Sequence, residues 1–132
     1  MSHEHLVDRL FEILISGDRD AARAFVAEAN RQGISAESLI SDIYWPTYEM
    51  IERLYRKDQM TAIAHNLSTR LLRVLVDQTA QRLNVAAPLG SSVFAVCGPN
   101  DPDELAAQMA VDLLEARGFT VSFAGGGIAS DE

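Results

Sequence analysis

Few residues in this chain have side chains suited to chemistry, and they lie in two places. His65 lies within an apolar, helix-forming segment, and Asp101 and Asp103 follow the turn-forming run Gly98-Pro99-Asn100. A histidine at such a place either ligates a metal or a ligand, or bonds a neighbouring side chain as part of the core. The sequence has three histidines and one cysteine, and it lacks a serine–histidine–acid set, a phosphate loop and zinc spacing. We therefore predict no catalytic residues and no enzymatic activity.

The acidic run Asp101-Pro102-Asp103-Glu104 directly precedes an amphipathic helical pattern. Its carboxylates either hold Mg²⁺ or cap the helix, and two such ligands are few for a metal ion. Acidic side chains cap a helix N-terminus and suit its dipole, so we interpret them as caps and expect no metal site. The glycine run Gly125-Gly126-Gly127 does not match the dinucleotide-binding fingerprint.

The segments that must position His65 are helical up to about residue 85. Apolar residues recur at helical spacing from Leu6 to Leu14 and again from Ala21 to Ala29. A third helix begins after Ser35 and is interrupted at Pro46, because proline lacks an amide hydrogen and crowds the preceding turn. With the helix that carries His65, this predicts a bundle of four or five helices.

The last helix of the bundle, about residues 60–83, has two apolar stripes. One contains Met60, Ile63, Leu67, Leu71 and Val74, and the other contains His65, Thr69, Leu72 and Val76. A bundle helix that touches only its bundle neighbours needs one stripe. We therefore expect both stripes to be buried, with the face that contains His65 and Leu72 packed onto a second, α/β layer of the protein.

A second kind of pattern follows a linker at about residues 86–92. The run Val93–Val96 is typical of a buried parallel strand, an amphipathic helix is predicted over residues 103–117, and a second strand over residues 119–123. The predicted fold is α/β and mostly α: a helical bundle over residues 1–85, then the beginning of a Rossmann- or flavodoxin-like parallel domain over residues 91–132. Because two parallel strands are not stable alone, we expect a fragment of a longer domain, or a partner chain that completes the sheet.

The overall charge and hydropathy restrict the partners. A net charge of -8 and a pI near 4.7 oppose direct contact with nucleic acid or an anionic membrane. No apolar run reaches the roughly 18 residues that span a bilayer, and the N-terminus shows no signal-peptide pattern. We predict a cytoplasmic protein that acts through a protein partner or a second copy of itself.

Two stretches resemble the cobalamin (vitamin B12)-binding family of corrinoid methyltransferase subunits, methionine synthase and light-sensing repressors. The stretch WPTYEMIERLYRKDQMTAIAHNLSTRLLRVL resembles the helical cap of that family, and GPNDPDELAAQMAVDLLEARGFTVSFAGGGI resembles the start of its α/β domain. The resemblance implies that a corrinoid binds between the two layers, close to the carboxyl ends of the strands, where Asp101, Asp103 and Gly125 fall.

The signature residues of that family are mostly replaced here. The lower-face motif Asp-x-His-x-x-Gly corresponds to residues 101–106, where Asp101 matches, Asp103 replaces the cobalt-ligating histidine and Ala106 replaces the glycine. In the upper-face pattern, Tyr55 falls at a tryptophan position, and His65 and Asn66 fall at a Glu-His pair. A carboxylate is a poor substitute for imidazole on cobalt, so ordinary cobalamin ligation is not expected.

Three functions are compatible with these residues. The first is a regulatory or sensory module that binds cobalamin or another tetrapyrrole such as haem, with Tyr55, His65, Asn66, Asp101, Asp103 and Gly125 as the candidate contacts. The second, with no ligand at all, is a protein–protein interaction domain in signalling or transcription regulation, and the sequence is equally compatible with it. The third is a corrinoid carrier for methyl transfer, which the missing histidine disfavours.

Overall fold

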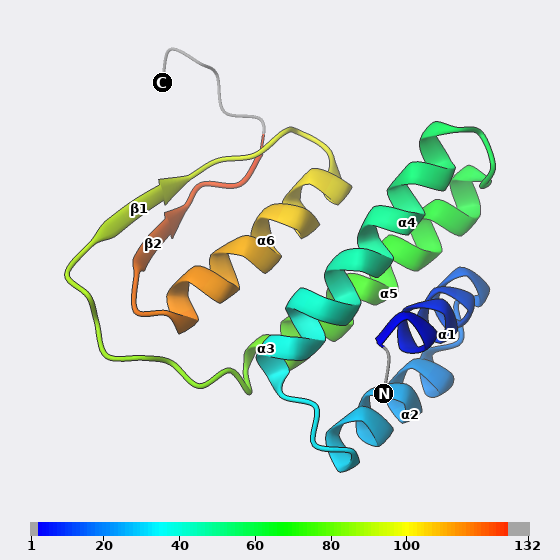
Figure 1. Cartoon of the computed structure of the whole chain (residues 1–132). Helices are drawn as coiled ribbons and strands as arrows, with labels where there is room; N and C mark the ends of the chain where they lie inside the picture. The colour runs from blue at the N-terminus through cyan, green and yellow to red at the C-terminus, as the bar shows by residue number, and fades with distance from the viewer. Residues whose placement is uncertain (1–2, 127–132) are drawn as a thin grey trace. The chain divides into compact units, whose positions relative to one another are not determined.

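A computed structural model describes residues 3–126 of the chain. It divides into two compact units, which we call the bundle unit (Met1–Arg82) and the strand–helix–strand unit (Leu83–Glu132). Each unit is described by itself below (Figure 1). Within the described range, no helix is long and apolar enough to cross a membrane.

The bundle unit consists of the predicted helices. They are α1 (His3–Ser16), α2 (Arg19–Arg31), α3 (Ala36–Ser38), the π-helical segment η1 (Leu39–Tyr44), α4 (Trp45–Arg56) and α5 (Ala62–Ala80). Asp18 caps α2, since its carboxylate accepts a hydrogen bond from the Ala21 amide at 3.0 Å. The Thr61 hydroxyl caps α5 in the same way, at 3.0 Å from the Ala64 amide.

The interruption predicted at Pro46 is a π-helical segment rather than a loop. Proline has no amide hydrogen, so the usual hydrogen bond to the carbonyl four residues earlier cannot form there. Pro46 occupies the first turn of α4, where no such bond is needed. Just before it, the Trp45 amide bonds the Ile40 carbonyl, five residues back, as in a π-helix. The chain remains helical through the junction while the hydrogen-bonding pattern shifts.

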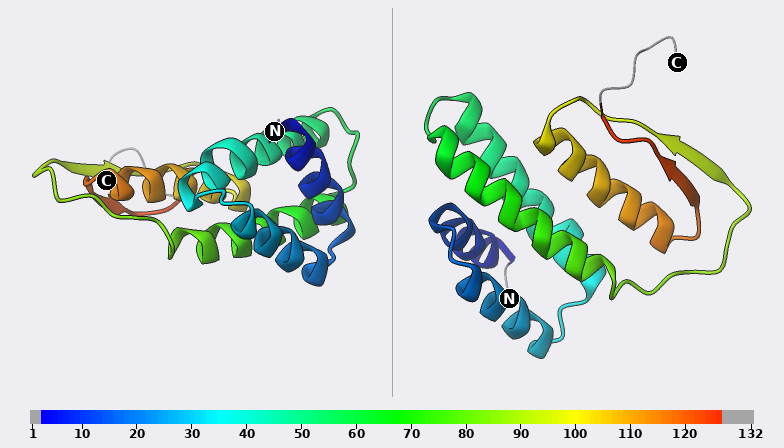
Figure 2. Two further views of the ribbon diagram at one scale, coloured as in Figure 1. Left: turned by 60° about the horizontal axis from the view of Figure 1, so that its bottom comes forward. Right: turned by 180° about the vertical axis from the view of Figure 1, so that it is seen from behind.

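The core of the bundle unit forms where α1, α4 and η1 pack on α5, with α2 against both α1 and α5 (Figure 2). Leu10 of α1, Ile43 of η1 and Ile51 of α4 are fully buried there. The His65 stripe of α5 is buried: Leu72 and Val76 are fully buried, and His65 and Thr69 are each 6% exposed. The helices that pack on α5 belong to the bundle, whereas the prediction assigned this stripe to the α/β layer.

The prediction for the other stripe of α5 is wrong. Ile63 is 74% exposed, Leu67 47% and Val74 41%, and only Leu71 is buried. Helical periodicity identifies apolar stripes but does not say which of them faces the core. Within the bundle unit, the neighbours of α5 lie on the His65 side, and the Ile63 side faces outward.

The strand–helix–strand unit is the predicted parallel crossover. Strand β1 (Ser92–Ala95) pairs with β2 (Thr120–Phe123) in parallel register, with Ser92 opposite Thr120 and Ala95 opposite Phe123. The helix between them, α6 (Asp101–Ala116), runs antiparallel to both strands and packs against β2 (Figure 1). The helix begins two residues earlier than predicted, because Asn100 is its cap.

Strand β1 is not buried on both faces, which corrects the sequence-based prediction. Phe94 is 71% exposed, and Val96, just beyond the strand, is 52% exposed. Side chains alternate between the two faces of a strand, and among the described residues of this unit only α6 covers a face. Val93 and Ala95 face that helix, and Phe94 lies on the open face.

Candidate functional site

Tyr55 and His65, two of the residues singled out through the family resemblance, lie in contact with each other. Tyr55 lies in the last turn of α4 and His65 in the first turn of α5, and the hairpin between the two helices brings the rings into contact. Their centroids are 3.8 Å apart and their planes differ by 4°, a close parallel stack. Tyr55 remains 39% exposed. Because His65 covers one face of the phenol ring, the accessible surface is on its other face and its edges.

Glu52 holds the buried ring of this stack in place. The His65 Nε2 atom lies 2.6 Å from Glu52 Oε1, and the two side chains are only 8% and 16% exposed. An ionised carboxylate can only accept a hydrogen bond, so Nε2 carries the hydrogen. We call Tyr55, His65 and Glu52 the Tyr55 platform: an aromatic ring with one open face, supported by a buried hydrogen-bonded pair.

The geometry changes the roles available to the predicted upper-face residues. The Nε2 atom of His65 is bonded to Glu52, and one face of its ring packs on Tyr55. These are the contacts expected of a histidine that bonds a neighbouring side chain as part of the core. Asn66 is exposed on α5 and does not belong to the platform. Sequence reasoning missed Glu52, although it lies one helical turn before Tyr55 on the same side of α4.

The predicted lower-face residues Asp101 and Asp103 lie in the first turn of α6, and Gly125 follows β2. We use the name β1–α6 loop for residues 96–106, which are the connection after β1 together with the start of α6. The Asp103 carboxylate accepts a hydrogen bond from the Asn100 amide at 3.3 Å, within a reciprocal capping box. Asp101 is exposed at the start of the helix. Asp103 is therefore a cap, as interpreted from the sequence. Nowhere in residues 3–126 do three or more histidine, cysteine or acidic side chains gather as a metal site requires.

The β1–α6 loop is closed against the end of β2. The Gly126 amide donates to Glu104 Oε1 at 3.2 Å, and the Cys97 amide donates to the Gly125 carbonyl at 3.1 Å. Gly125 has a φ of +80°, a conformation that favours glycine, and Gly126 lies so close to the Gly98 carbonyl that a side chain there would collide with it. Gly127 lies outside the described residues.

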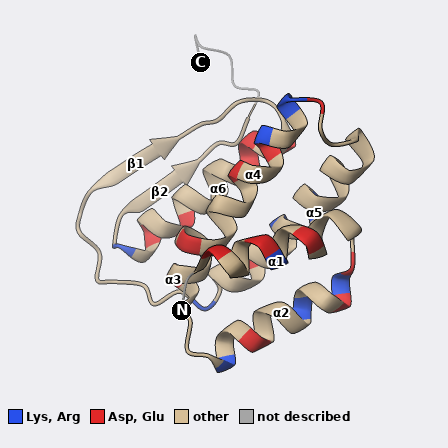
Figure 3. Cartoon of the chain, turned by 45° about the vertical axis from the view of Figure 1, so that its right-hand side comes forward, with Lys and Arg blue, Asp and Glu red and all other residues tan. Residues whose placement is uncertain are grey.

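This loop also sets the environment of the single cysteine. Burial raises the pKa of the Cys97 thiol, and the Glu104 and Asp103 carboxylates raise it further. A thiol with a raised pKa is mostly protonated at neutral pH and a weak nucleophile. Helix α6, whose first turn carries two of the carboxylates near Cys97, has three acidic residues in its first turn and no basic residue in its last turn (Figure 3).

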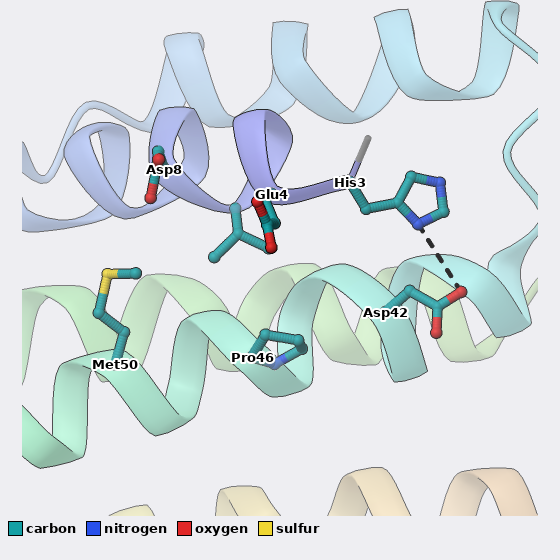
Figure 4. Close-up of a pocket in the computed structure, with 7 residues that line it drawn as sticks. His3, Glu4, Asp8, Asp42, Pro46 and Met50 are labelled. Carbon is teal, nitrogen blue, oxygen red and sulfur yellow. Dashed lines mark ion pairs between the residues drawn. The ribbon is translucent and has the colours of Figure 1, made fainter. Parts of the chain in front are cut away.

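A groove of about 400 Å³ lies elsewhere in the bundle unit, between the start of α1 and the η1–α4 junction (Figure 4). Its lining is partly acidic and partly apolar: His3, Glu4, Val7, Asp8, Asp42, Pro46 and Met50. His3 Nδ1 lies 3.8 Å from Asp42 Oδ2 across its mouth. None of the residues singled out for a corrinoid lines this groove, which is separate from the Tyr55 platform.

Comparison with known proteins decides the family. The sequence profile described as the B12 binding domain matches residues 6–78, more than half of the chain. The chain belongs to the B12 binding domain family. The matched residues lie in the bundle unit and include the whole Tyr55 platform, whereas Asp101, Asp103 and Gly125 lie beyond them.

The solved structures add a likeness in fold. The methanol:cobalamin methyltransferase complex MtaBC from Methanosarcina barkeri contains a chain that is similar with a TM-score of 0.53 and 18% identity. The match covers 96% of this chain and 49% of that chain, so this chain spans about half the length of the solved relative. At this identity the likeness shows the fold alone, a helical bundle with the start of a Rossmann-like unit. Comparison with curated proteins gives no match.

Proposed function

We propose that this chain is a non-catalytic, regulatory corrinoid-binding module in which the Tyr55 platform stacks on one face of the macrocycle. The observation that carries the proposal is a half-exposed ring stacked on a buried histidine within the segment that matches the B12 binding domain. A planar ring held rigidly from behind loses little conformational entropy when a second planar ring packs on its open face.

The residues of the β1–α6 loop do not fit the usual ligation of cobalt from below. Asp103 takes the place of the histidine, and its carboxylate already bonds the Asn100 amide. The Ala106 side chain replaces the glycine of the motif. Tyr55 would hold the corrinoid by packing, and no side chain in the motif would supply a nitrogen to the metal. Corrinoid-dependent carriers use the metal for methyl transfer, so this donor set favours a sensory or regulatory role.

Binding is tested with the full chain and three probes: hydroxocobalamin, adenosylcobalamin and haem. We expect a cobalamin to remain with the protein through desalting and to raise its thermal midpoint. Replacement of Tyr55 by leucine (Tyr55→Leu) keeps an apolar side chain but removes the ring, and should weaken cobalamin binding about five- to tenfold. Haem in place of cobalamin would identify a different tetrapyrrole as the ligand.

Trp45→Leu is the matched control. Trp45 is an aromatic residue on the same helix, it is 38% exposed, and it stacks on Tyr48 with centroids 5.4 Å apart. Binding should be unchanged in this variant. If none of the three probes is retained or stabilises the protein, the corrinoid part of the proposal is wrong.

A ligand-free interaction domain is the second candidate, favoured by the closed β1–α6 loop. In that case the binding experiments with all three probes are negative and Tyr55→Leu changes only stability. A methyl carrier is distinguished from a regulatory module by methyl transfer to or from the bound corrinoid, which we do not expect.

A further inference from the structure

The outward stripe of α5 carries both apolar and charged residues at helical spacing. Ile63, Leu67 and Val74 are each more than 40% exposed, and Arg70 and Asp77 continue the same line along the helix. Successive members are four, three, four and three residues apart, the spacing of a seam between two packed helices. We call these five residues the Ile63 stripe. Large aliphatic side chains aligned in this way on an open helix face mark an interaction surface.

The two charges on the Ile63 stripe, Arg70 and Asp77, have no ion-pair partner within residues 3–126. Arg70 and Asp77 are seven residues apart, about 10.5 Å along the helix, so they cannot pair with each other. Both side chains are exposed. Val74 lies almost midway between them.

We propose that the Ile63 stripe is the interface of a homodimer, in which α5 of a second copy packs antiparallel across Val74. A two-fold axis at Val74 places Arg70 of each chain beside Asp77 of the other, which gives two reciprocal ion pairs around an apolar centre. A two-fold interface requires such self-complementarity, because the same surface must face its own copy. A basic residue and an acidic residue placed symmetrically about an aliphatic residue meet that requirement.

The distribution of charge allows this contact despite the acidic composition. Residues 1–82 contain ten basic and twelve acidic residues, whereas residues 83–132 contain one basic and seven acidic residues. Two bundle units therefore repel each other little, and the strongly acidic surface lies in the other unit. The dimer goes beyond the proposed corrinoid binding and is independent of it.

The test is sedimentation equilibrium of the full chain without corrinoid, from micromolar to submillimolar concentration. The wild-type chain should show a reversible monomer–dimer equilibrium. In the single variants Arg70→Glu and Asp77→Arg, residues 70 and 77 carry like charges and face each other at both symmetric contacts of the dimer. Each variant should raise the dissociation constant at least about tenfold. The double variant Arg70→Glu/Asp77→Arg restores both pairs with reversed polarity and should return the constant to within about threefold of wild type.

Arg53→Glu is the control, because it makes the same change of charge at an exposed residue of α4. It should leave the monomer–dimer equilibrium unchanged. Circular dichroism checks that every variant keeps its helix content. A wild-type chain that stays monomeric throughout overturns the proposal. So does a dimer that ignores the single variants, or a double variant as weak as they are.

Discussion

In the bundle unit, a buried histidine and glutamate support an aromatic ring whose other face is open. In the strand–helix–strand unit, the carboxylates at the start of α6 instead accept hydrogen bonds from backbone amides of the same unit. His65 and Glu52 meet at 2.6 Å behind Tyr55. Asp103 caps α6, and Glu104 holds the Gly126 amide. Both arrangements satisfy buried or half-buried polar groups, and the first also leaves one face of an aromatic ring open.

Under the proposed function, this difference predicts that the two units respond differently to substitution. The residues matched by the family profile include the Tyr55 platform and end before the β1–α6 loop. The loop has residues suited to its own stability where the family motif has a metal ligand. Substitutions in the bundle unit should therefore affect ligand binding. Substitutions in the β1–α6 loop should mainly affect folding.

The largest expected effect separates the packed core of the bundle from the open face of the sheet. Leu10 is fully buried where α1 packs on α5, and Leu10→Ala should lower the free energy of unfolding by about 2–5 kcal/mol. Phe94→Ala removes a larger side chain from the open face of β1 and should change it by less than about 0.5 kcal/mol. Urea unfolding followed by circular dichroism measures both, and equal losses would mean that Phe94 is covered in solution.

The next effect is a loss of stability at high pH that belongs to the bundle unit, which holds all three tyrosines. Burial raises the pKa of Tyr44 from 10.0 to about 12, although its hydrogen bond to Thr79 and the charge of Arg82 act in the opposite direction. The folded state therefore keeps the proton more strongly than the unfolded state. Its contribution is complete below about pH 10 and is lost as the pH rises to about 12.

Tyr44→Phe is the test of that loss. The wild-type chain should lose about 2 kcal/mol between pH 10 and pH 12 that the variant does not lose. At neutral pH the variant should be about 1 kcal/mol less stable, because the Thr79 hydroxyl loses its partner at 2.9 Å. Identical pH profiles for the two proteins would show that Tyr44 does not titrate in this range.

Glu52 should contribute both to the stability of the fold and to the support of the Tyr55 ring. Glu52→Ala leaves the buried His65 Nε2 atom without its partner and should cost about 1–2 kcal/mol in thermal or urea unfolding. Glu49→Ala removes an exposed carboxylate one turn earlier on the same helix and should have little effect. If cobalamin binds, its affinity should fall with Glu52→Ala and not with Glu49→Ala. Equal behaviour of the two variants would show that the buried pair does not support the ring.

Several of these features follow from the sequence because they depend on local patterns. The caps at Asp18 and Asp103, the break at Pro46 and the crossover from β1 to β2 each depend on residues close together in the chain. The family resemblance singled out Tyr55 and His65 as candidate ligand contacts, but their contact with each other was not predicted, since the two residues are ten apart on successive helices.

The remaining features depend on tertiary packing. Glu52 reaches His65 only because α4 and α5 cross as they do, and sequence spacing does not encode that crossing. The burial predicted for Ile63 was wrong for a related reason: periodicity shows an apolar stripe but not its partner. The close approach of Gly98 and Gly126 joins the ends of two strands and is likewise a nonlocal effect.

A pair of substitutions in the β1–α6 loop, with an expected loss of stability no larger than that of Glu52→Ala, tests the comparison between the units most directly. Asp103→His combined with Ala106→Gly restores the family motif in the β1–α6 region. The double variant loses the Asp103 cap and gains a helical glycine, which together should cost about 1–2 kcal/mol. If cobalamin binds, the variant should show nitrogen coordination in the electron paramagnetic resonance spectrum of the Co(II) form, and the wild-type protein should show none from a protein histidine.

The control places the same residue types near the other end of α6, as Glu115→His with Ala110→Gly, where neither residue lies in the motif. Labelling the histidines with ¹⁵N distinguishes their nitrogen from that of the cobalamin's own base. Protein nitrogen on cobalt in the wild-type chain would break the comparison, because a histidine outside the loop would then replace the lost ligand. Its appearance only with Asp103→His would show that one cap residue separates a structural loop from a metal-binding one.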